Sequence, residues 1–200
     1  MRIMRKSELE RVLQTIPPHQ DPRPSLEQYC TPATIAADVL YIALGFGDIE
    51  GKNVIDLGCG TGIFSIGSAL LGASSVLGID IDPLAIDDAK KMTSKLGLEA
   101  EYEMCDVKDV RGTYDTVIMN PPFGSQRKGA DRPFLETAID IAPVVYSLHN
   151  AITAPFLEKI VASLGRSISF QKSYKFQIPH LFKFHERVRK EIDVLLLRIC

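Results

Sequence analysis

The sequence predicts an α/β protein with a mostly parallel, seven-stranded sheet and helices on both faces. Short apolar runs alternate along the chain with longer segments of helical periodicity. Alternation of this kind gives a parallel sheet whose crossover connections are right-handed. A glycine-rich turn follows the first apolar run, and acidic residues follow the next two. Ligands of open α/β sheets bind at the carboxyl ends of the strands, so these residues mark a candidate site.

The individual elements are expected in the following order. An amphipathic helix over residues 4–15 precedes a proline-rich extended connector, and Thr31 is expected to cap a helix that runs from Pro32 to about residue 44. Residues 1–30 would thus form a helix and connector, and residues 31–200 a single domain. Further helices are expected at 63–71, 83–96, 133–141 and 154–164. Strands are expected at 53–57, 75–80, 101–105, 115–119 and 144–149, with a closing pair at 167–176 and 192–199.

Composition places the chain among ordinary globular proteins, with 46% hydrophobic and 24% charged residues. No apolar run approaches the roughly 20 residues that cross a bilayer, so no membrane association is expected. The four cysteines lie far apart without a CxxC pair, which argues against a zinc site and a disulfide framework. Free thiols in the cytoplasm, and no metal, are the expectation.

The net charge of −2 conceals basic ends. Residues 159–200 carry nine Lys and Arg against three acids, and residues 1–11 carry four against two. Basic ends on a nearly neutral protein are compatible with local binding of a phosphate backbone. A solvated basic face would give the same pattern, so charge alone does not decide between them.

The turn after the first strand reads Asp56-x-Gly58-x-Gly60-x-Gly62. Glycines at 58 and 60 permit positive φ and let a ligand approach the backbone, while Asp56 places a carboxylate suited to a cationic amino group. The nicotinamide fingerprint G-x-G-x-x-G does not fit, because its third glycine would fall on Ile63 or Ser65.

Two further acids complete the expected pocket. Asp80 ends the second strand 20 residues after Gly60, where a carboxylate accepts ribose hydroxyls. Asp106 ends the third strand, in position for the amine of an adenine whose ring would pack on Val107 or Ile81. A ribose, an adenine and a positive charge without phosphate describe S-adenosylmethionine.

The fourth strand leads into Asn120-Pro121-Pro122-Phe123. The prolines remove two backbone donors and hold Asn120 extended, which leaves a rigid corner of acceptor oxygens. Two such acceptors, the Asn120 side chain and the Pro121 carbonyl, would grip the hydrogens of a planar amine, while Phe123 stacks on its ring. A plain turn after a strand is the alternative interpretation. The polar loop 124–132 is expected to overhang this corner, and His149 is expected to be structural.

The segments VIDLGCGTG, GIDIDP, CDV and VIMNPPFG resemble class I methyltransferases acting on exocyclic amines. Residues 26–31, 146–149, 174–176 and 183–185 are similar to one family of these, the archaeal and eukaryotic N6-adenine methyltransferases of small-subunit ribosomal RNA. The resemblance implies that Gln28 and Thr31 cover the methionine end of S-adenosylmethionine and that Gly58, Thr61 and Ile63 line the same pocket. It also implies a Rossmann-like fold and an RNA substrate, and it raises the possibility of a small zinc-containing activator protein.

Two other functions remain open from the sequence. The same chemistry would serve a protein glutamine amide or a DNA adenine, although the basic tail and Phe rather than Tyr at 123 favour nucleic acid. A non-catalytic RNA-binding assembly factor that keeps a cofactor pocket is the third possibility, and the intact residues 120–123 argue against it.

Overall fold

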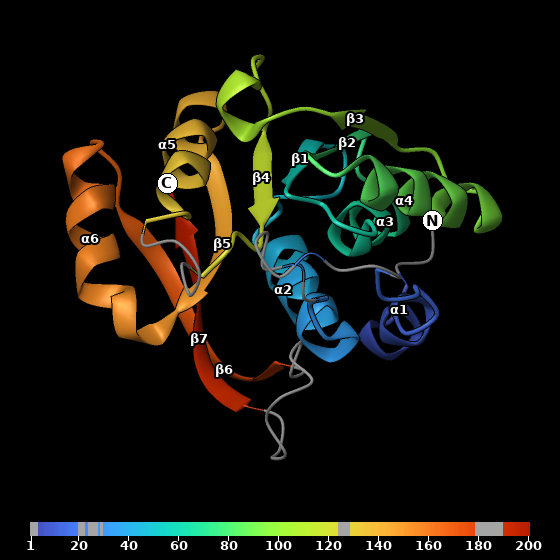
Figure 1. Ribbon diagram of the computed structural model, residues 1–200, viewed down its shortest axis with the longest axis horizontal. Helices are drawn as coiled ribbons and strands as arrows, with labels where there is room; N and C mark the ends of the chain where they lie inside the picture. The colour runs from blue at the N-terminus through green and yellow to red at the C-terminus, as the bar shows by residue number, and fades with distance from the viewer. Residues whose placement is uncertain (1–3, 20–22, 24–27, 29, 124–128, 179–189) are drawn as a thin grey trace.

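The computed structural model describes residues 4–19, 23, 28, 30–123, 129–178 and 190–200, and side chains are described for all of these except 177, 178 and 190. Its centre is a seven-stranded sheet with the order β3-β2-β1-β4-β5-β7-β6 (Figure 1). The strands are β1 (Asn53–Leu57), β2 (Ser75–Asp80), β3 (Glu101–Met104), β4 (Thr116–Met119), β5 (Val144–Asn150), β6 (Ile168–Ile178) and β7 (Lys190–Ile199). The first five are mutually parallel, and β7 is antiparallel to both β5 and β6. The predicted mostly parallel sheet of seven strands is therefore confirmed.

The helices also lie close to their predicted places. They are α1 (Lys6–Leu13), α2 (Ala33–Gly45), α3 (Ile63–Leu70), α4 (Pro83–Lys95), α5 (Arg132–Ile141) and α6 (Ala154–Ser163). Short 3-10 turns, η2 (Val107–Asp109) and η3 (Ala151–Thr153), follow β3 and β5. None of the helices in the described part of the chain has the length and apolar character needed to cross a membrane.

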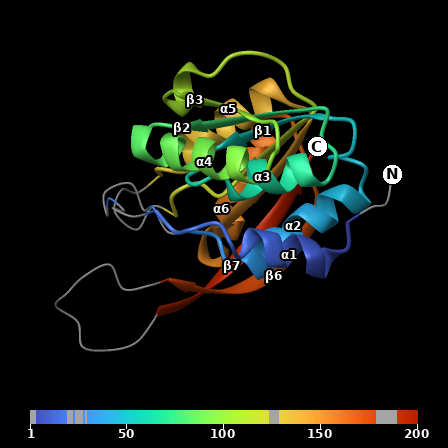
Figure 2. The same ribbon diagram turned by 90° about the vertical axis from the view of Figure 1, so that its right-hand side faces the viewer.

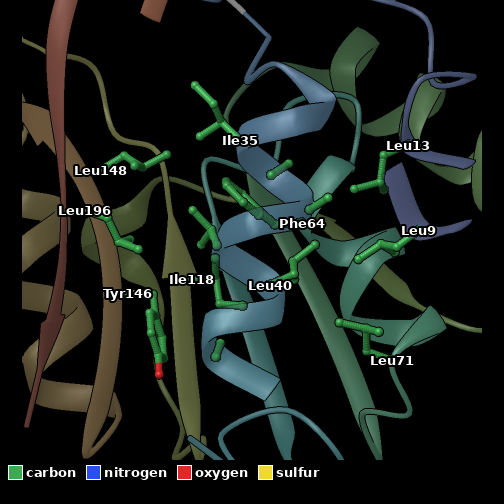
Figure 3. Close-up of a cluster of buried hydrophobic side chains, with 14 of the residues drawn as sticks. Leu9, Leu13, Ile35, Leu40, Phe64, Leu71, Ile118, Tyr146, Leu148 and Leu196 are labelled. Atoms are coloured by element: carbon green, nitrogen blue, oxygen red, sulfur yellow. The ribbon is translucent and has the colours of Figure 1, made fainter. Parts of the chain in front are cut away.

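Alternating side chains of the strands build a separate core on each face of the sheet, as the period of two along a strand requires. Val54, Ile118 and Leu196 belong to the core on the face covered by α1, α2 and α3. Figure 3 shows Leu40 of α2 beside Ile118, with Leu9 and Leu13 of α1 on the other side of α2. Ile55 and Val117, the neighbours of two of these, point to the opposite core with α5 and α6. Figure 2 shows the sheet between these two helical layers.

One predicted cap is wrong. The N-cap of α2 is Pro32, and no side-chain hydrogen bond caps this helix. The Thr31 hydroxyl instead accepts a hydrogen bond from Nδ2 of Asn120, 89 positions away in the sequence. The local pattern suited a cap, but a tertiary partner uses this oxygen.

A carboxylate on α2 ties three elements together. The Asp38 carboxylate accepts hydrogen bonds from Lys6 on α1 and from Lys172 and Tyr174 on β6. Burial alone would raise the pKa of Asp38, but the hydrogen bonds from Lys172, Lys6 and Tyr174 lower it to about 2. The N-terminal helix is therefore fastened to the far end of the sheet.

A second carboxylate joins the loop after α2 to β5 and β7. Asp48 Oδ2 accepts the Tyr146 hydroxyl at 2.6 Å and Arg198 Nε at 2.8 Å. Its backbone carbonyl accepts the Thr116 hydroxyl at 2.7 Å. All of these groups are largely buried, so the charges of Asp48 and Arg198 depend on each other.

Candidate active site

A cavity of about 660 Å³ opens at the carboxyl ends of β1, β2, β3 and β4. This position is the switch point of the strand order, between β1 and β4, where open α/β sheets bind ligands. Its volume lies within the range of about 300–1,000 Å³ that is usual for small-molecule sites. Most of the residues expected from the sequence line it: Gln28, Thr31, Gly58, Gly60, Thr61, Ile63, Asp80, Asp106, Val107, Asn120 and Pro122.

The glycine turn forms the floor of the cavity and is fastened to β2. The backbone N–H groups of Gly58 and Cys59 both donate to the Ile79 carbonyl at 2.8 Å. Gly60, which lines the cavity, has φ of 54°, and a Cβ added there would meet no atom within 4 Å. The turn therefore presents bare backbone to whatever the cavity holds.

Asp80 stands beside this turn at the end of β2. Its Oδ2 accepts the Gly60 N–H at 2.8 Å, and its Oδ1 accepts the Asp82 N–H at 2.9 Å. Burial raises the pKa of Asp80, although these backbone hydrogen bonds oppose the rise. Each carboxylate oxygen keeps acceptor capacity for one further donor, which is what two ribose hydroxyls require.

Asp56 does not reach the cavity surface. It is only 1% exposed, and its Oδ2 accepts both the N–H and the hydroxyl of Ser65, at 2.9 and 2.7 Å. Burial, with a smaller contribution from nearby Asp80, raises its pKa to about 7. The expectation that its carboxylate meets a cationic amino group directly does not match this placement. Asp56 holds the start of α3 beneath the turn, because the strand turns it inward.

The opposite end of the cavity is formed by the residues after β2 and β3. The Asp106 side chain accepts the Lys108 N–H at 3.0 Å and so begins η2. Val107 is 8% exposed, whereas Ile81 is 53% exposed. An acceptor beside two apolar side chains suits a flat ring with an exocyclic amine.

Asn120 occupies the corner between these groups and the end of β4. Its Nδ2 donates to the Thr31 hydroxyl at 2.9 Å. Its Oδ1 is buried and has no hydrogen-bond partner among the described residues. A buried acceptor without a donor is costly, and such an atom can be satisfied by a water, an ion or a ligand.

Of the other three residues in the segment 120–123, only Pro122 lines the cavity. Pro121 is buried. Phe123 is half-buried, and its ring meets that of Phe176 on β6 edge to face, with centroids 6.1 Å apart and planes at 82°. The ring of Phe123 is therefore held by the tail of the chain. Residue 29 of the segment 26–31 and residues 124–128 of the polar loop lie outside the described residues.

Some residues at or behind the cavity wall were not expected from the sequence, and three of them carry polar or aromatic groups that shape the site. His19 and Phe134 line the wall, and Asp82 stands behind it. The repeated acid in Ile79-Asp80-Ile81-Asp82 was visible, but nothing local indicated that the second acid would meet residues 54 and 63 positions earlier. Phe134 comes within 3.1 Å of where a Cβ of Gly58 would be, which gives a second reason for glycine at 58.

His149 and Cys59 are buried within the fold, and their surroundings indicate a structural role. His149 is 1% exposed, with Nε2 2.7 Å from the Ser147 hydroxyl and Nδ1 3.3 Å from Asp131. Cys59 is 5% exposed, and burial, followed by the charges of Asp56 and Asp80, raises the pKa of its thiol well above the usual value. A buried thiol with a raised pKa is a poor nucleophile.

The strand order, the glycine turn and the acids at the ends of β2 and β3 define a class I S-adenosylmethionine-dependent methyltransferase. The family model for ribosomal protein L11 methyltransferase (PrmA) matches residues 42–121. The rRNA N(6)-adenosine-methyltransferase METTL5 of Danio rerio is 38% identical over 98% of each chain. The chain therefore belongs to the family of METTL5 rRNA N6-adenosine-methyltransferases.

Solved structures agree with this assignment. A candidate RNA methyltransferase, PH1948 from Pyrococcus horikoshii, is 40% identical and superposes with a TM-score of 0.92, over 99% of this chain and 98% of that one. Magnesium protoporphyrin IX methyltransferase from Synechocystis, solved with bound S-adenosylmethionine, shares the fold at 19% identity and a TM-score of 0.66, over 82% of this chain and 77% of that one.

Proposed function

We propose that this protein transfers the methyl group of S-adenosylmethionine to the exocyclic N6 of an adenine in RNA, with small-subunit ribosomal RNA in the cytoplasm as the substrate. The observation that carries the proposal is the buried Oδ1 of Asn120, which has no hydrogen-bond partner among the residues that the structure describes. It lies in the same cavity as the glycine turn and Asp80. An acceptor for an amine and a nucleoside site thus share one space.

The described residues fit the cofactor. Open space at Gly60 admits a ligand against the backbone, and the spare acceptor capacity of Asp80 suits a ribose. Asp106 and Val107 would hold the adenine, and Gln28 and Thr31 would cover the methionine end. When bound, S-adenosylmethionine supplies an activated methyl group.

The acceptor base would be held by the tetrapeptide at the end of β4. Oδ1 of Asn120 and the Pro121 carbonyl would each accept one hydrogen of the adenine amine. This grip favours the geometry in which the nitrogen lone pair is available for attack, and Phe123 would hold the ring in line. The base must leave its stack to enter, which single-stranded RNA allows at low cost.

The chain needs no strong general base for this reaction. As the amine nitrogen forms its new bond, it gains positive charge and its proton becomes acidic, so water accepts the proton. The Asn120 Oδ1 and the Pro121 carbonyl would stabilise the developing charge, because both are hydrogen-bond acceptors. Preorganised dipoles of this kind need no rearrangement during the reaction.

Methyl transfer onto defined acceptors tests the proposal. The protein would be incubated with radiolabelled S-adenosylmethionine and unmethylated small-subunit ribosomal RNA, and the product nucleosides identified by mass spectrometry. N6-methyladenosine at one position, and none with Asn120→Ala, is the expected result. Transfer to no RNA, or to a nitrogen other than N6, would refute the proposal.

The other acceptors are distinguished in the same assay. A protein glutamine amide or a DNA adenine would take label from parallel reactions with release factor or duplex DNA. Label on either of these alone would favour that acceptor. A non-catalytic assembly factor would bind S-adenosylmethionine but give no transfer even in a single turnover.

A small zinc-containing activator protein forms the second part of the proposal. The edge strand β3 pairs only with β2 on the described sheet, and Met104 at its end is 60% exposed. Ile81 and Leu84, close to it after β2, are also about half exposed. An open sheet edge beside apolar side chains is a surface that a partner protein stabilises. Greater solubility and activity on co-expression with such a partner would support this part, and full activity of the isolated chain would exclude it.

A further inference from the structure

The wall of the cavity nearest the N-terminus is built from residues that precede the sheet. His19, Gln28 and Thr31 all line the cavity, although they lie between α1 and α2. These residues therefore need an anchor elsewhere in the fold to stay in place. Thr31 has its anchor in Asn120.

Asp82 provides the anchor for the other two. Its side chain is completely buried and it is the N-cap residue of α4. Oδ1 accepts the Leu84 N–H at 3.1 Å, as an N-cap does. Oδ2 accepts a hydrogen bond from Nε2 of Gln28 at 2.8 Å and lies 3.1 Å from Nε2 of His19. One oxygen thus serves the helix and the other serves the cavity wall.

The remaining contacts of this wall restrict it further. The Gln28 Oε1 accepts the Arg23 N–H at 2.7 Å, so both ends of the Gln28 amide are held and its orientation is fixed. Gln28 still has one amide hydrogen and one lone pair for a ligand. Arg23 Nε lies 3.8 Å from Asp82 Oδ2. Burial alone would raise the pKa of Asp82, but the hydrogen bonds from Gln28 and His19 lower it, so this carboxylate is charged.

Asp82 is also linked to the expected ribose site. Its backbone N–H donates to Oδ1 of Asp80 at 2.9 Å. Two residues only two positions apart, Asp80 and Asp82, therefore supply the expected ribose acceptor and the anchor of Gln28. A shift of Asp82 would disturb both.

From this geometry we infer that Asp82 and His19 are positioning residues of the cofactor pocket, which hold Gln28 against the ligand and so set the affinity for S-adenosylmethionine. His19 is 5% exposed at its side chain, and its Nδ1 has no hydrogen-bond partner in the described part of the chain. Asp88 on α4 lies 3.9 Å from this Nδ1. The inference rests on the proposed cofactor pocket, and it adds two residues that act through Gln28.

The test uses the full chain with Asp82→Asn. Asparagine is as good an N-cap as aspartate, but it has a single side-chain oxygen and cannot serve both the helix and the wall. We expect the Kd and the KM for S-adenosylmethionine to rise at least tenfold. We expect kcat at saturating cofactor to stay within twofold, and the melting temperature of the ligand-free protein to change by only a few degrees.

His19 gives a second pair of variants. His19→Ala should raise the Kd for S-adenosylmethionine by a similar factor. His19→Gln keeps an N–H donor for Asp82 and should recover much of the affinity. Asp88→Asn is the matched control, because Asp88 approaches His19 without a hydrogen bond to Gln28 or Asp82; its Kd should stay within twofold.

The outcomes test the positioning role of Asp82 and His19 separately from the proposed cofactor pocket. If Asp82→Asn and His19→Ala fold and bind S-adenosylmethionine like the wild type, the positioning role is refuted. If Asp82→Asn does not fold, the contrast between His19→Ala and His19→Gln decides. If the wild type binds no S-adenosylmethionine, the cofactor pocket itself is refuted, which is a separate result in the same titration.

Discussion

Asn120→Ala tests the proposed chemistry at a single atom. The substitution removes Oδ1, the buried acceptor with no partner among the described residues, and the hydrogen bond that Nδ2 donates to the Thr31 hydroxyl. Loss of one hydrogen bond that strengthens in the transition state costs about 10²- to 10³-fold in kcat. The Thr31 hydroxyl loses its donor, which should lower the free energy of unfolding by about 1 kcal/mol. The cofactor contacts at Asp80 and Gly60 are untouched.

Single-turnover methyl transfer to RNA and calorimetric titration of S-adenosylmethionine measure the two effects separately. We expect the rate to fall by at least 10²-fold and the Kd to stay within about threefold. Thr31→Val is the matched variant, because it breaks the same hydrogen bond but leaves Oδ1 in place. Its rate should fall by less than that of Asn120→Ala. A rate within tenfold of the wild type for Asn120→Ala, or a Kd that rises as much as the rate falls, would refute the proposed role.

Three further predictions concern the cofactor and stability. Asp80→Asn should weaken the binding free energy of S-adenosylmethionine by about 1.5–3 kcal/mol, the scale of hydrogen bonds to a charged group, and unchanged affinity in calorimetry would contradict the ribose assignment. Arg198→Ala leaves the carboxylate of Asp48 buried without its cation and should lower the free energy of unfolding by about 3 kcal/mol in urea, whereas Lys175→Ala, which removes only exposed ion pairs, should change it little. Folding lowers the pKa of Asp38 from 3.8 to about 2, so this carboxyl contributes about 2 kcal/mol that is fully present above pH 4 and is lost as the pH falls toward 2. Asp38→Asn should therefore be less stable than the wild type at pH 6, with the difference shrinking in acid melts, and a difference that is the same at pH 2.5 would contradict this.

The sequence predicted those features that depend on neighbouring residues. Each strand from β1 to β5 was marked by its own apolar run, and the glycine turn and Asp80 by their spacing. The features that it did not predict depend on residues far apart. The Thr31–Asn120 bond spans 89 positions and the His19–Asp82 contact spans 63. No local pattern distinguishes a threonine that caps a helix from one that accepts a hydrogen bond from a distant side-chain amide.

Asp56 shows a second limit of prediction from sequence, which concerns the direction of a side chain. Its position beside the turn was correct, but the direction of its side chain depends on which face of β1 it occupies. Ser65, at the start of α3, satisfies one of its oxygens from inside the protein. Sequence position alone does not tell an acid that supports a turn from an acid that faces a ligand.

The place of β7 has a consequence for how the chain acquires its structure during synthesis. This strand comes last in the described sequence but lies inside the sheet, between β5 and β6. Until residues 190–199 emerge from the ribosome, β5 presents an unpaired apolar edge and β6 has no neighbour to hold it. Vectorial folding can therefore complete the cofactor half early, whereas the half that carries Phe176 waits for the final segment. Truncation before residue 190 should thus leave a nascent chain that depends on chaperones.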